Sequence, residues 1–226
     1  MVKYKDSLIV DDDRFYRRHK LMRKLRIVIN VILILIVLAV WVSLFFITEE
    51  GMLESPGITS LKYYTVLSNL FYMVASVIWL IKPCDATERL KYSSVVALMV
   101  TFSVVLFFLG PLYGFIALFS GTNLWYHLIV PLAGTAEFVV FERMPVKIKD
   151  NLWATSSVFV YGTFYMLNNL INGTGVYPNT NDWYGFLLWG WPVGIVIFIG
   201  IAGLAFGMGL LIRGLIKLRV KVMKNE

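Results

Sequence analysis

Residues 27–47 read IVINVILILIVLAVWVSLFFI, a run of 21 residues without a charged side chain. A helix needs about 20 predominantly apolar residues to cross the hydrocarbon core of a bilayer. The apolar residues follow one another without the strict alternation that marks the strands of a membrane barrel. This stretch therefore predicts a transmembrane helix, and it sets the interpretation of the rest of the chain.

Five further apolar stretches of comparable length follow, at residues 61–81, 92–118, 124–141, 152–170 and 186–212. The chain has 226 residues, of which 58% are hydrophobic, a share that is high for a soluble domain. We therefore predict an all-α polytopic membrane protein with six transmembrane helices in one bundle, spanning residues 27–212. A basic segment, residues 1–26, precedes this domain, and a basic tail, residues 213–226, follows it and is expected to extend the last helix.

The basic residues indicate how the chain is oriented. Of the 21 Lys and Arg residues, all except Lys62 fall in the N-terminal segment, the second and fourth connections or the C-terminal tail. Basic residues near the ends of spans stay on the cytoplasmic side. Both termini are therefore predicted to be cytoplasmic, in an integral membrane protein.

The composition also excludes several classes of function. The net charge of +7 lies almost entirely at predicted membrane edges, where anionic lipid headgroups offset it, so we expect no nucleic-acid partner. Cys84 is the only cysteine, and His19 and His127 are the only histidines. A thiolate or histidine metal site is therefore not expected, and neither is a cofactor. Membrane lipids are the expected partners, and the sequence does not predict an oligomeric state.

Polar residues recur along the second predicted span at a helical spacing. They are Thr65, Ser68, Asn69, Tyr72 and Ser76. The intervals of three, four, seven and eleven residues place all five on one helical face. Polar groups inside a bilayer are costly unless they face the bundle interior or water, so this face should look inward. Such a face either lines a site or supplies hydrogen bonds between helices.

A histidine in the fourth predicted span lies at a depth similar to that of Thr65. Thr65 and His127 each follow the predicted start of their span by a few residues, about 5–6 Å at 1.5 Å per residue. Both spans are predicted to enter from the outer side. If these helices are neighbours, a hydroxyl and an imidazole can meet there, which is the pairing of nucleophile and base that covalent acyl transfer needs.

Further polar residues are candidates for binding a substrate. Glu137 lies about 15 Å deeper than His127 by helical rise, either as a buried acid or at the cytoplasmic edge beside Arg143. Asn168 and Asn169 close the fifth span, and Tyr177 lies in the long outer loop that follows. Asparagine side chains here can donate hydrogen bonds to an oxyanion, bind headgroups or hold helices together, and these alternatives remain open.

Three short motifs resemble those of a bacterial family of six-span membrane proteins. The second-span motif is YYTVLSN at residues 63–69. The fourth-span motif is HLIVP at residues 127–131, followed by the acidic Glu137, and the outer element is Tyr-Pro at residues 177–178. The family usually has Asp-Trp where this chain has Glu-Phe, and it often repeats Tyr-Pro, which occurs once here.

That family is similar to the eukaryotic androgen-induced-gene hydrolases, in which an intramembrane threonine and histidine cleave esters of hydroxy fatty acids. The resemblance implies Thr65 as the nucleophile and His127 as the base, and it implies a bacterial plasma membrane as the location. Ser68, Asn69, Tyr72, Glu137, Asn168, Asn169 and Tyr177 are the candidate substrate-binding residues.

Three functions are consistent with these observations. The first is an intramembrane hydrolase of fatty-acyl esters that acts on a lipid near the outer membrane face. The second is a non-catalytic lipid or small-molecule binder or transporter, whose cavity is lined by the polar face and Glu137. The third is a structural protein whose polar groups only hold helices together. We favour the first.

Overall fold

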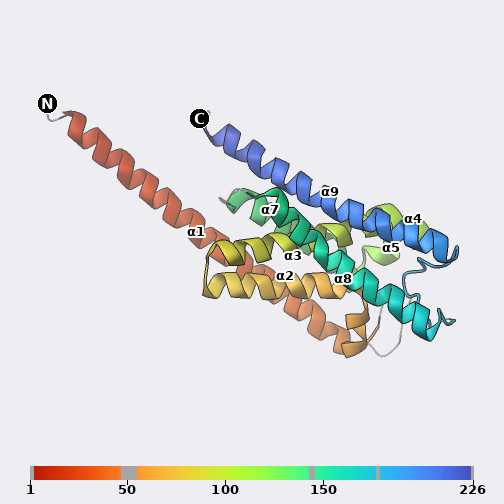
Figure 1. Ribbon diagram of the computed structural model, residues 1–226. Coiled ribbons are helices and arrows are strands. Elements are labelled where there is room, and N and C mark those ends of the chain that lie inside the picture. Colours follow the sequence, from red (N-terminus) through yellow and green to blue (C-terminus); the bar gives the residue numbers. More distant parts are fainter. Residues whose placement is uncertain (1–2, 47–54, 143–145, 177–178, 225–226) are drawn as a thin grey trace.

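The computed structural model describes residues 3–46, 55–142, 146–176 and 179–224, with side chains placed between residues 20 and 223 of these ranges. The described part of the chain is helical and contains no strand. The long helices lie side by side in one bundle (Figure 1). The all-helical fold predicted from the apolar stretches is therefore confirmed for the described residues.

The main helices are α1 (Lys3–Ser43), α2 (Tyr64–Ile81), α3 (Asp85–Val104), α7 (Val130–Phe141), α8 (Ile148–Asn172) and α9 (Trp191–Lys224). Short elements connect or extend them. These are the 3-10 turns η1 (Leu44–Phe46) and η2 (Gly57–Lys62), the π-helical turns η3 (Val105–Leu109) and η4 (Trp125–Ile129), and the single turns α4 (Gly110–Tyr113), α5 (Phe115–Leu118) and α6 (Gly121–Leu124).

Successive long helices run in opposite directions, so both chain ends lie at one end of the bundle (Figure 1). We call this the terminal end. It carries residues 82–84, between α2 and α3, and the described residues 142 and 146–147, between α7 and α8. The opposite, loop end carries residues 55–63, 114–123, 173–176 and 179–190.

Five helical segments are long and apolar enough to span a membrane. They are Lys20–Phe46, Tyr64–Ile81, Asp85–Tyr113, Gly121–Phe141 and Trp191–Met223. The remaining long helix, α8, has 25 residues but a more polar composition. Its outer face nevertheless exposes large apolar side chains, among them Val160, Phe164 and Leu170.

The helices differ from the predicted spans mainly at their ends. α1 is continuous from the N-terminal segment into the first span, and α9 continues the last helix through the basic tail. The sixth apolar stretch was expected to be helical from Phe186. Residues 186–190 instead form turns, with Gly185 and Gly190 at φ 71° and 85°. Glycine adopts positive φ without a steric penalty, which allows the chain to turn here before α9 begins.

α3 lies at the centre of the bundle, packed against α2, α7, α8 and α9. Its join with α8 and α9 depends on Gly209. The Tyr92 hydroxyl shares its one hydrogen between two acceptors, the Gly209 carbonyl oxygen and Asn151 Oδ1, each at 2.9 Å. A Cβ atom at position 209 would lie 1.6 Å from Asn151 Oδ1, so only glycine lets α8 approach α9 this closely.

Candidate active site

Thr65 is the second residue of α2, at the loop end of the bundle. The first backbone N–H groups of a helix have no acceptor within the helix, and together they form its positive end. The N–H of Tyr64 donates to the Tyr184 hydroxyl at 2.6 Å, and the Thr65 N–H points to the same hydroxyl. Among the described residues, no hydrogen bond involves the Thr65 hydroxyl. This hydroxyl thus lies free at a helix N-terminus, which stabilises negative charge.

His127 lies in the π-helical turn η4, just before Pro131, and its side chain is buried. Its Nδ1 lies 2.6 Å from the carbonyl oxygen of Leu118. Because a carbonyl can only accept, Nδ1 carries the hydrogen, and Nε2 of the neutral ring is left with its lone pair. The ring also meets Phe119 edge to face, at 6.5 Å between centroids. These contacts fix both the tautomer and the orientation of the imidazole.

Thr65 and His127, for which the sequence predicted only a similar depth, line the same cavity. This loop-end cavity contains about 350 Å³ of space between atoms, part of it open to the surroundings. Its other lining residues are Leu44, Ser55, Ser60, Tyr63, Val66, Thr122, Asn123 and Tyr126. The structure therefore places Thr65 and an oriented imidazole on the wall of one pocket, which has several polar lining residues.

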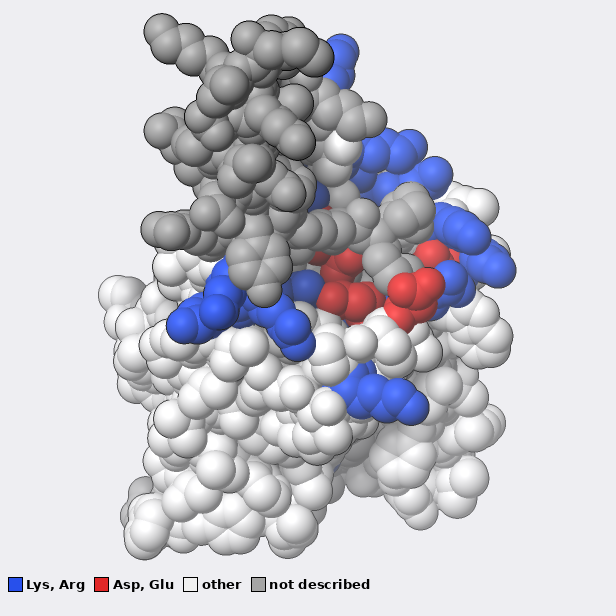
Figure 2. All heavy atoms as spheres, turned by 90° about the vertical axis from the view of Figure 1, so that its left-hand side faces the viewer, with Lys and Arg blue, Asp and Glu red and all other residues white. Residues whose placement is uncertain are grey.

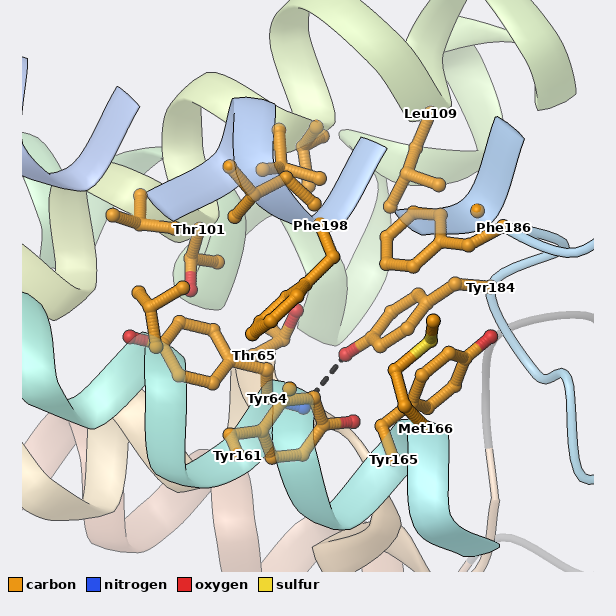
Figure 3. A pocket seen from close by; sticks show the side chains of 17 residues that line it. Tyr64, Thr65, Thr101, Leu109, Tyr161, Tyr165, Met166, Tyr184, Phe186 and Phe198 are labelled. Atoms are coloured by element: carbon orange, nitrogen blue, oxygen red, sulfur yellow. Dashed lines mark hydrogen bonds between the residues drawn. The ribbon is translucent and has the colours of Figure 1, made fainter. Parts of the chain in front are cut away.

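A second, larger cavity also reaches Thr65. It contains about 610 Å³ of space between atoms and lies between α2, α3, α8 and α9, where almost all of its wall is apolar (Figure 3). Val100, Val104, Leu109, Val158, Met166, Phe198 and Ile201 supply much of that wall. Thr65 is the one residue that lines both of these cavities. It therefore stands at the junction of an apolar chamber and a polar one.

The glycine at position 162 shapes the apolar cavity. A Cβ atom there would lie 2.0 Å from the ring of Phe198, so the absence of a side chain on α8 lets this ring lie flat against the helix. Phe198 also meets Phe159 edge to face, at 5.9 Å between centroids. The width of the chamber between α8 and α9 thus depends on one residue without a side chain.

Tyr184 is the functional candidate that the sequence did not single out. It comes from the loop between α8 and α9, and its ring stacks on Phe186 at 5.0 Å between centroids. Its hydroxyl oxygen reaches the first turn of α2 beside Thr65 (Figure 3). Burial raises the pKa of Tyr184, so the hydroxyl keeps its hydrogen at neutral pH and can act as a donor. The only sequence signal was the aromatic-rich loop, which is also typical of a membrane interface.

The remaining polar residues of α2 face inward, as their spacing predicted, but they line neither cavity. Ser68 bonds the Thr101 hydroxyl at 2.8 Å and the Thr65 carbonyl at 3.0 Å. Asn69 donates from Nδ2 to the carbonyls of Thr65 at 2.7 Å and Tyr126 at 3.1 Å. Tyr72 has no exposed surface. These side chains tie α2 to α3 and η4 and so hold Thr65 in place.

Asn168 and Asn169 hold the loop after α8 and do not line either cavity. Asn169 Nδ2 donates to the carbonyls of Tyr165 and Asn181, both at 2.9 Å, and Asn168 Nδ2 donates to Asn181 Oδ1 at 3.3 Å. The structure thus does not bring them to Thr65 as oxyanion donors. Tyr177, the last of the predicted binding residues, lies outside the described residues.

Glu137 is far from both cavities and belongs to a buried ion cluster near the terminal end. We define the buried ion cluster as Arg26, Asn30, Glu88, Lys91, Glu137 and Glu142. Glu137 receives hydrogen bonds from Arg26 Nε at 2.8 Å, Asn30 Nδ2 at 3.0 Å and Lys91 Nζ at 2.6 Å. Of the two positions foreseen for Glu137, the structure thus has the buried acid.

Two members of the cluster differ from their predicted positions. Arg26 and Lys91 were counted among the basic residues that flank the spans, but both are buried inside the bundle, Lys91 completely. Arg26 also binds Glu88 through both terminal nitrogens, at 2.7 and 2.8 Å, and its guanidinium lies 4.2 Å from the centre of the Trp79 ring. A charged residue at the edge of an apolar stretch can be exposed beside the membrane or buried in the bundle. Which of the two applies depends on the partners that the fold brings to it.

No family model, no curated protein and no solved structure matches this chain. The roles of Thr65 and His127 therefore depend on the geometry described above. Within the described residues there is also no group of three or more His, Cys, Asp or Glu side chains arranged to hold a metal ion.

Proposed function

We propose that this protein is an intramembrane hydrolase of fatty-acyl esters, with Thr65 as the nucleophile and His127 as the general base. The observation that carries the proposal is the position of Thr65 at the junction of two cavities. The apolar cavity suits an acyl chain, and the polar cavity suits the ester group and water. A hydroxyl at this junction lies where the carbonyl carbon of a bound ester would be.

The chemistry follows from the groups around Thr65. His127 Nε2 takes the proton of the Thr65 hydroxyl, directly or through one water, while the oxygen attacks the ester carbonyl. His127 then returns that proton to the leaving alcohol. Water, activated by the same Nε2, releases the fatty acid from the acyl-threonine. The Leu118 carbonyl holds the Nδ1 hydrogen throughout and so leaves Nε2 as the basic nitrogen.

The developing oxyanion has one candidate donor beside Thr65. It is the Tyr184 hydroxyl, whose oxygen already accepts from the Tyr64 N–H at the positive end of α2. Donors that are fixed before the reaction stabilise a developing charge without a reorganisation cost. This hydroxyl takes the role that the sequence had suggested for asparagine side chains.

We infer that the protein spans the membrane six times. α8 is then a span in addition to the five helical segments named above, and the terminal end lies in the cytoplasm. The length of α8 and its exposed apolar side chains support a span. The basic residues gathered at the terminal end support its cytoplasmic location. The active site would then lie near the outer face, and substrate could enter sideways from the lipid.

The decisive experiment compares the purified wild type with Thr65→Val and His127→Gln on a panel of fatty-acyl esters and a fluorophosphonate probe. Valine keeps the shape of threonine and removes only the hydroxyl. Both variants should lose turnover and labelling. Thr163→Val is the matched control, since Thr163 lies on the exposed face of α8, and it should retain full activity.

Turnover that survives in Thr65→Val would exclude Thr65 as the nucleophile. If the wild type neither cleaves nor labels, the second function is favoured, a lipid or small-molecule binder or transporter. The apolar cavity supports that alternative, because it would hold an acyl chain whether or not Thr65 reacts. Mass spectrometry of lipids that copurify with the wild type and with Val104→Phe, which narrows the cavity from its α3 wall, would then test it.

A further inference from the structure

Three buried polar atoms on the inner face of α2 have no hydrogen-bond partner among the described residues. They are Asn69 Oδ1, the Tyr72 hydroxyl and Ser76 Oγ. The three residues are fully buried, and their spacing of three and four places them in one row along the helix. A buried polar group without a partner costs about 1–3 kcal/mol, and native proteins usually satisfy such groups with ordered water. Three in one row therefore indicate a function.

At the loop end, this row begins beside the cavity that contains Thr65 and His127. Asn69 Nδ2 donates to the carbonyl of Tyr126, and Tyr126 is part of the cavity wall. Tyr72 follows one turn further along, where its ring packs against Gly134 of α7. A Cβ atom at position 134 would lie 3.0 Å from Tyr72 Cζ, so glycine is what allows the tyrosine to lie at the bundle centre.

On the other side, the row meets the buried ion cluster. Lys91 Nζ lies 5.8 Å from the centre of the Tyr72 ring and 2.6 Å from Glu137 Oε2. Arg26 then connects Glu137, at 2.8 Å, with Glu88, at 2.7 Å, and with Glu142, at 3.4 Å. The row on α2 thus meets the cluster where the Tyr72 ring lies beside the Lys91 ammonium.

The cluster ends at a third cavity, which lies at the terminal end. It contains about 230 Å³ of space between atoms and is lined by Glu88, Arg89, Tyr92, Phe138, Glu142, Val146 and Asp150. Seen from this end, acidic side chains gather at the centre of the face, with basic side chains around them (Figure 2). Polar groups therefore lie along the length of the bundle, with a cavity at each end.

We propose that this series of groups, the polar column, conducts protons between the loop-end cavity and the terminal end of the protein. The polar column consists of Asn69, Tyr72 and Ser76 together with the buried ion cluster. Ionisable residues inside a membrane bundle commonly form proton relays. The activity is separate from ester hydrolysis and needs neither Thr65 nor His127.

Each step of the path moves one proton and leaves no net change. A proton from water in the loop-end cavity reaches the Tyr72 and Ser76 hydroxyls through internal water beside Asn69, and each hydroxyl accepts one hydrogen and releases another. Lys91 gives its proton to the Glu137 carboxylate and is recharged from the Tyr72 side. Glu137 passes the proton through internal water to Glu88 or Glu142, and water in the terminal cavity receives it.

The charges around the path favour one mobile proton. Within the cluster, the two cations Arg26 and Lys91 face the three carboxylates of Glu88, Glu137 and Glu142. Groups of the neighbouring elements surround the cluster. The Trp79 indole donates to Glu88 at 2.6 Å, and the Arg219 guanidinium donates to the backbone carbonyl of Glu142. Arg89 pairs with Asp150 at 3.2 Å. An arginine cannot give up its proton in a protein. Arg26 therefore positions the carboxylates, while these and Lys91 exchange the proton.

The test measures proton flux into liposomes that contain the purified protein and a pH-sensitive dye, with a potassium diffusion potential as the driving force. The wild type should carry protons faster than protein-free liposomes. Tyr72→Phe and Glu137→Gln should reduce the flux to the protein-free level. Ser76→Ala is compared with Ser93→Ala, whose hydroxyl bonds the Arg89 carbonyl outside the column, and only Ser76→Ala should slow the flux.

Tyr72→Phe keeps the proposal testable even if Glu137→Gln does not fold, because it removes only a hydroxyl without a partner and should not destabilise the protein. A wild type no faster than protein-free liposomes would overturn the proposal. So would a flux that both column variants leave unchanged. No ester is present in this assay, so its outcome is independent of the hydrolase proposal.

Discussion

The Lys91 ammonium lies 2.6 Å from the Glu137 carboxylate, and neither side chain has any exposed surface. The pair joins α3 to α7 in the interior of a bundle whose outer surface is apolar. Asn30 of α1 completes the arrangement, since it donates to Glu137 and accepts from Lys91. Charges in such a setting are retained only when each has a close partner.

Removing one member of this pair should therefore be costly. We expect Lys91→Met to destabilise the protein by about 3–5 kcal/mol, because it leaves part of a buried carboxylate without its partner. The double variant Lys91→Met/Glu137→Gln should be more stable than Lys91→Met alone, since it removes the stranded charge. Unfolding in detergent measures both. Lys82→Met, at an exposed position, is the control, and a Lys91→Met protein as stable as this control would contradict the expectation.

The same pair shows what sequence reasoning could not reach. The apolar stretches predicted the long helices, and the spacing of Ser68, Asn69 and Tyr72 predicted the buried face of α2, because both signals are local. Lys91 stands directly before the third predicted span, where a topology signal is the usual explanation. Its true position depends on Glu137, 46 residues later in the chain. A pairing between residues so far apart in the chain produces no periodic pattern in the sequence.

In the candidate site, too, some features could be predicted from the sequence and others could not. Helical rise alone brought Thr65 and His127 to a similar depth, and the structure places them on one cavity. The tautomer of His127 depends on the Leu118 carbonyl, which the π-helical turn η4 brings within reach. Tyr184 reaches α2 only because the loop after α8 turns at Gly185 and Gly190. Neither contact could be predicted from the spacing of residues in the sequence.

Gly209→Ala tests how closely α9 must approach α8. The added methyl group would overlap the Asn151 side chain and disturb the hydrogen bonds of Tyr92, so we expect a loss of about 1–3 kcal/mol, as for other overpacked sites. Gly207→Ala, two residues earlier on the same helix, meets no atom within 4 Å. It should be neutral or slightly stabilising, because alanine favours the helix. Equal melting temperatures of the two variants would show that the contact is not needed.

Tyr184→Phe tests the proposed oxyanion donor. If the hydrolase proposal holds, loss of this donor should lower kcat by about 10²–10³-fold. KM should change little, because the hydrogen bond strengthens only in the transition state. Tyr113→Phe is the control, since the Tyr113 hydroxyl bonds the backbone carbonyl of the same Tyr184 at 3.2 Å. Similar losses of kcat in both variants would point to support of the loop instead of a donor role.

The only cysteine provides a test of orientation. Cys84 is exposed in the connection between α2 and α3, at the terminal end. We expect a membrane-impermeant maleimide to label it in inside-out vesicles and not in intact cells, because the basic terminal end should face the cytoplasm. Cys84→Ser, which should not be labelled, is the control. Labelling of the wild type in intact cells would reverse the orientation and place the Thr65 cavity on the cytoplasmic side.

The pH dependence of this labelling follows from the local structure. The backbone N–H and the side chain of Thr87 lower the pKa of the Cys84 thiol, because they stabilise the thiolate. Since the thiolate is the reactive form, labelling should already be fast at a pH where an ordinary cysteine reacts slowly. Thr87→Ala removes one of these contacts, so its labelling rate should rise only at higher pH. A stopped-flow series over pH measures both curves, and coincident curves would mean that the Thr87 hydroxyl does not act on the thiol.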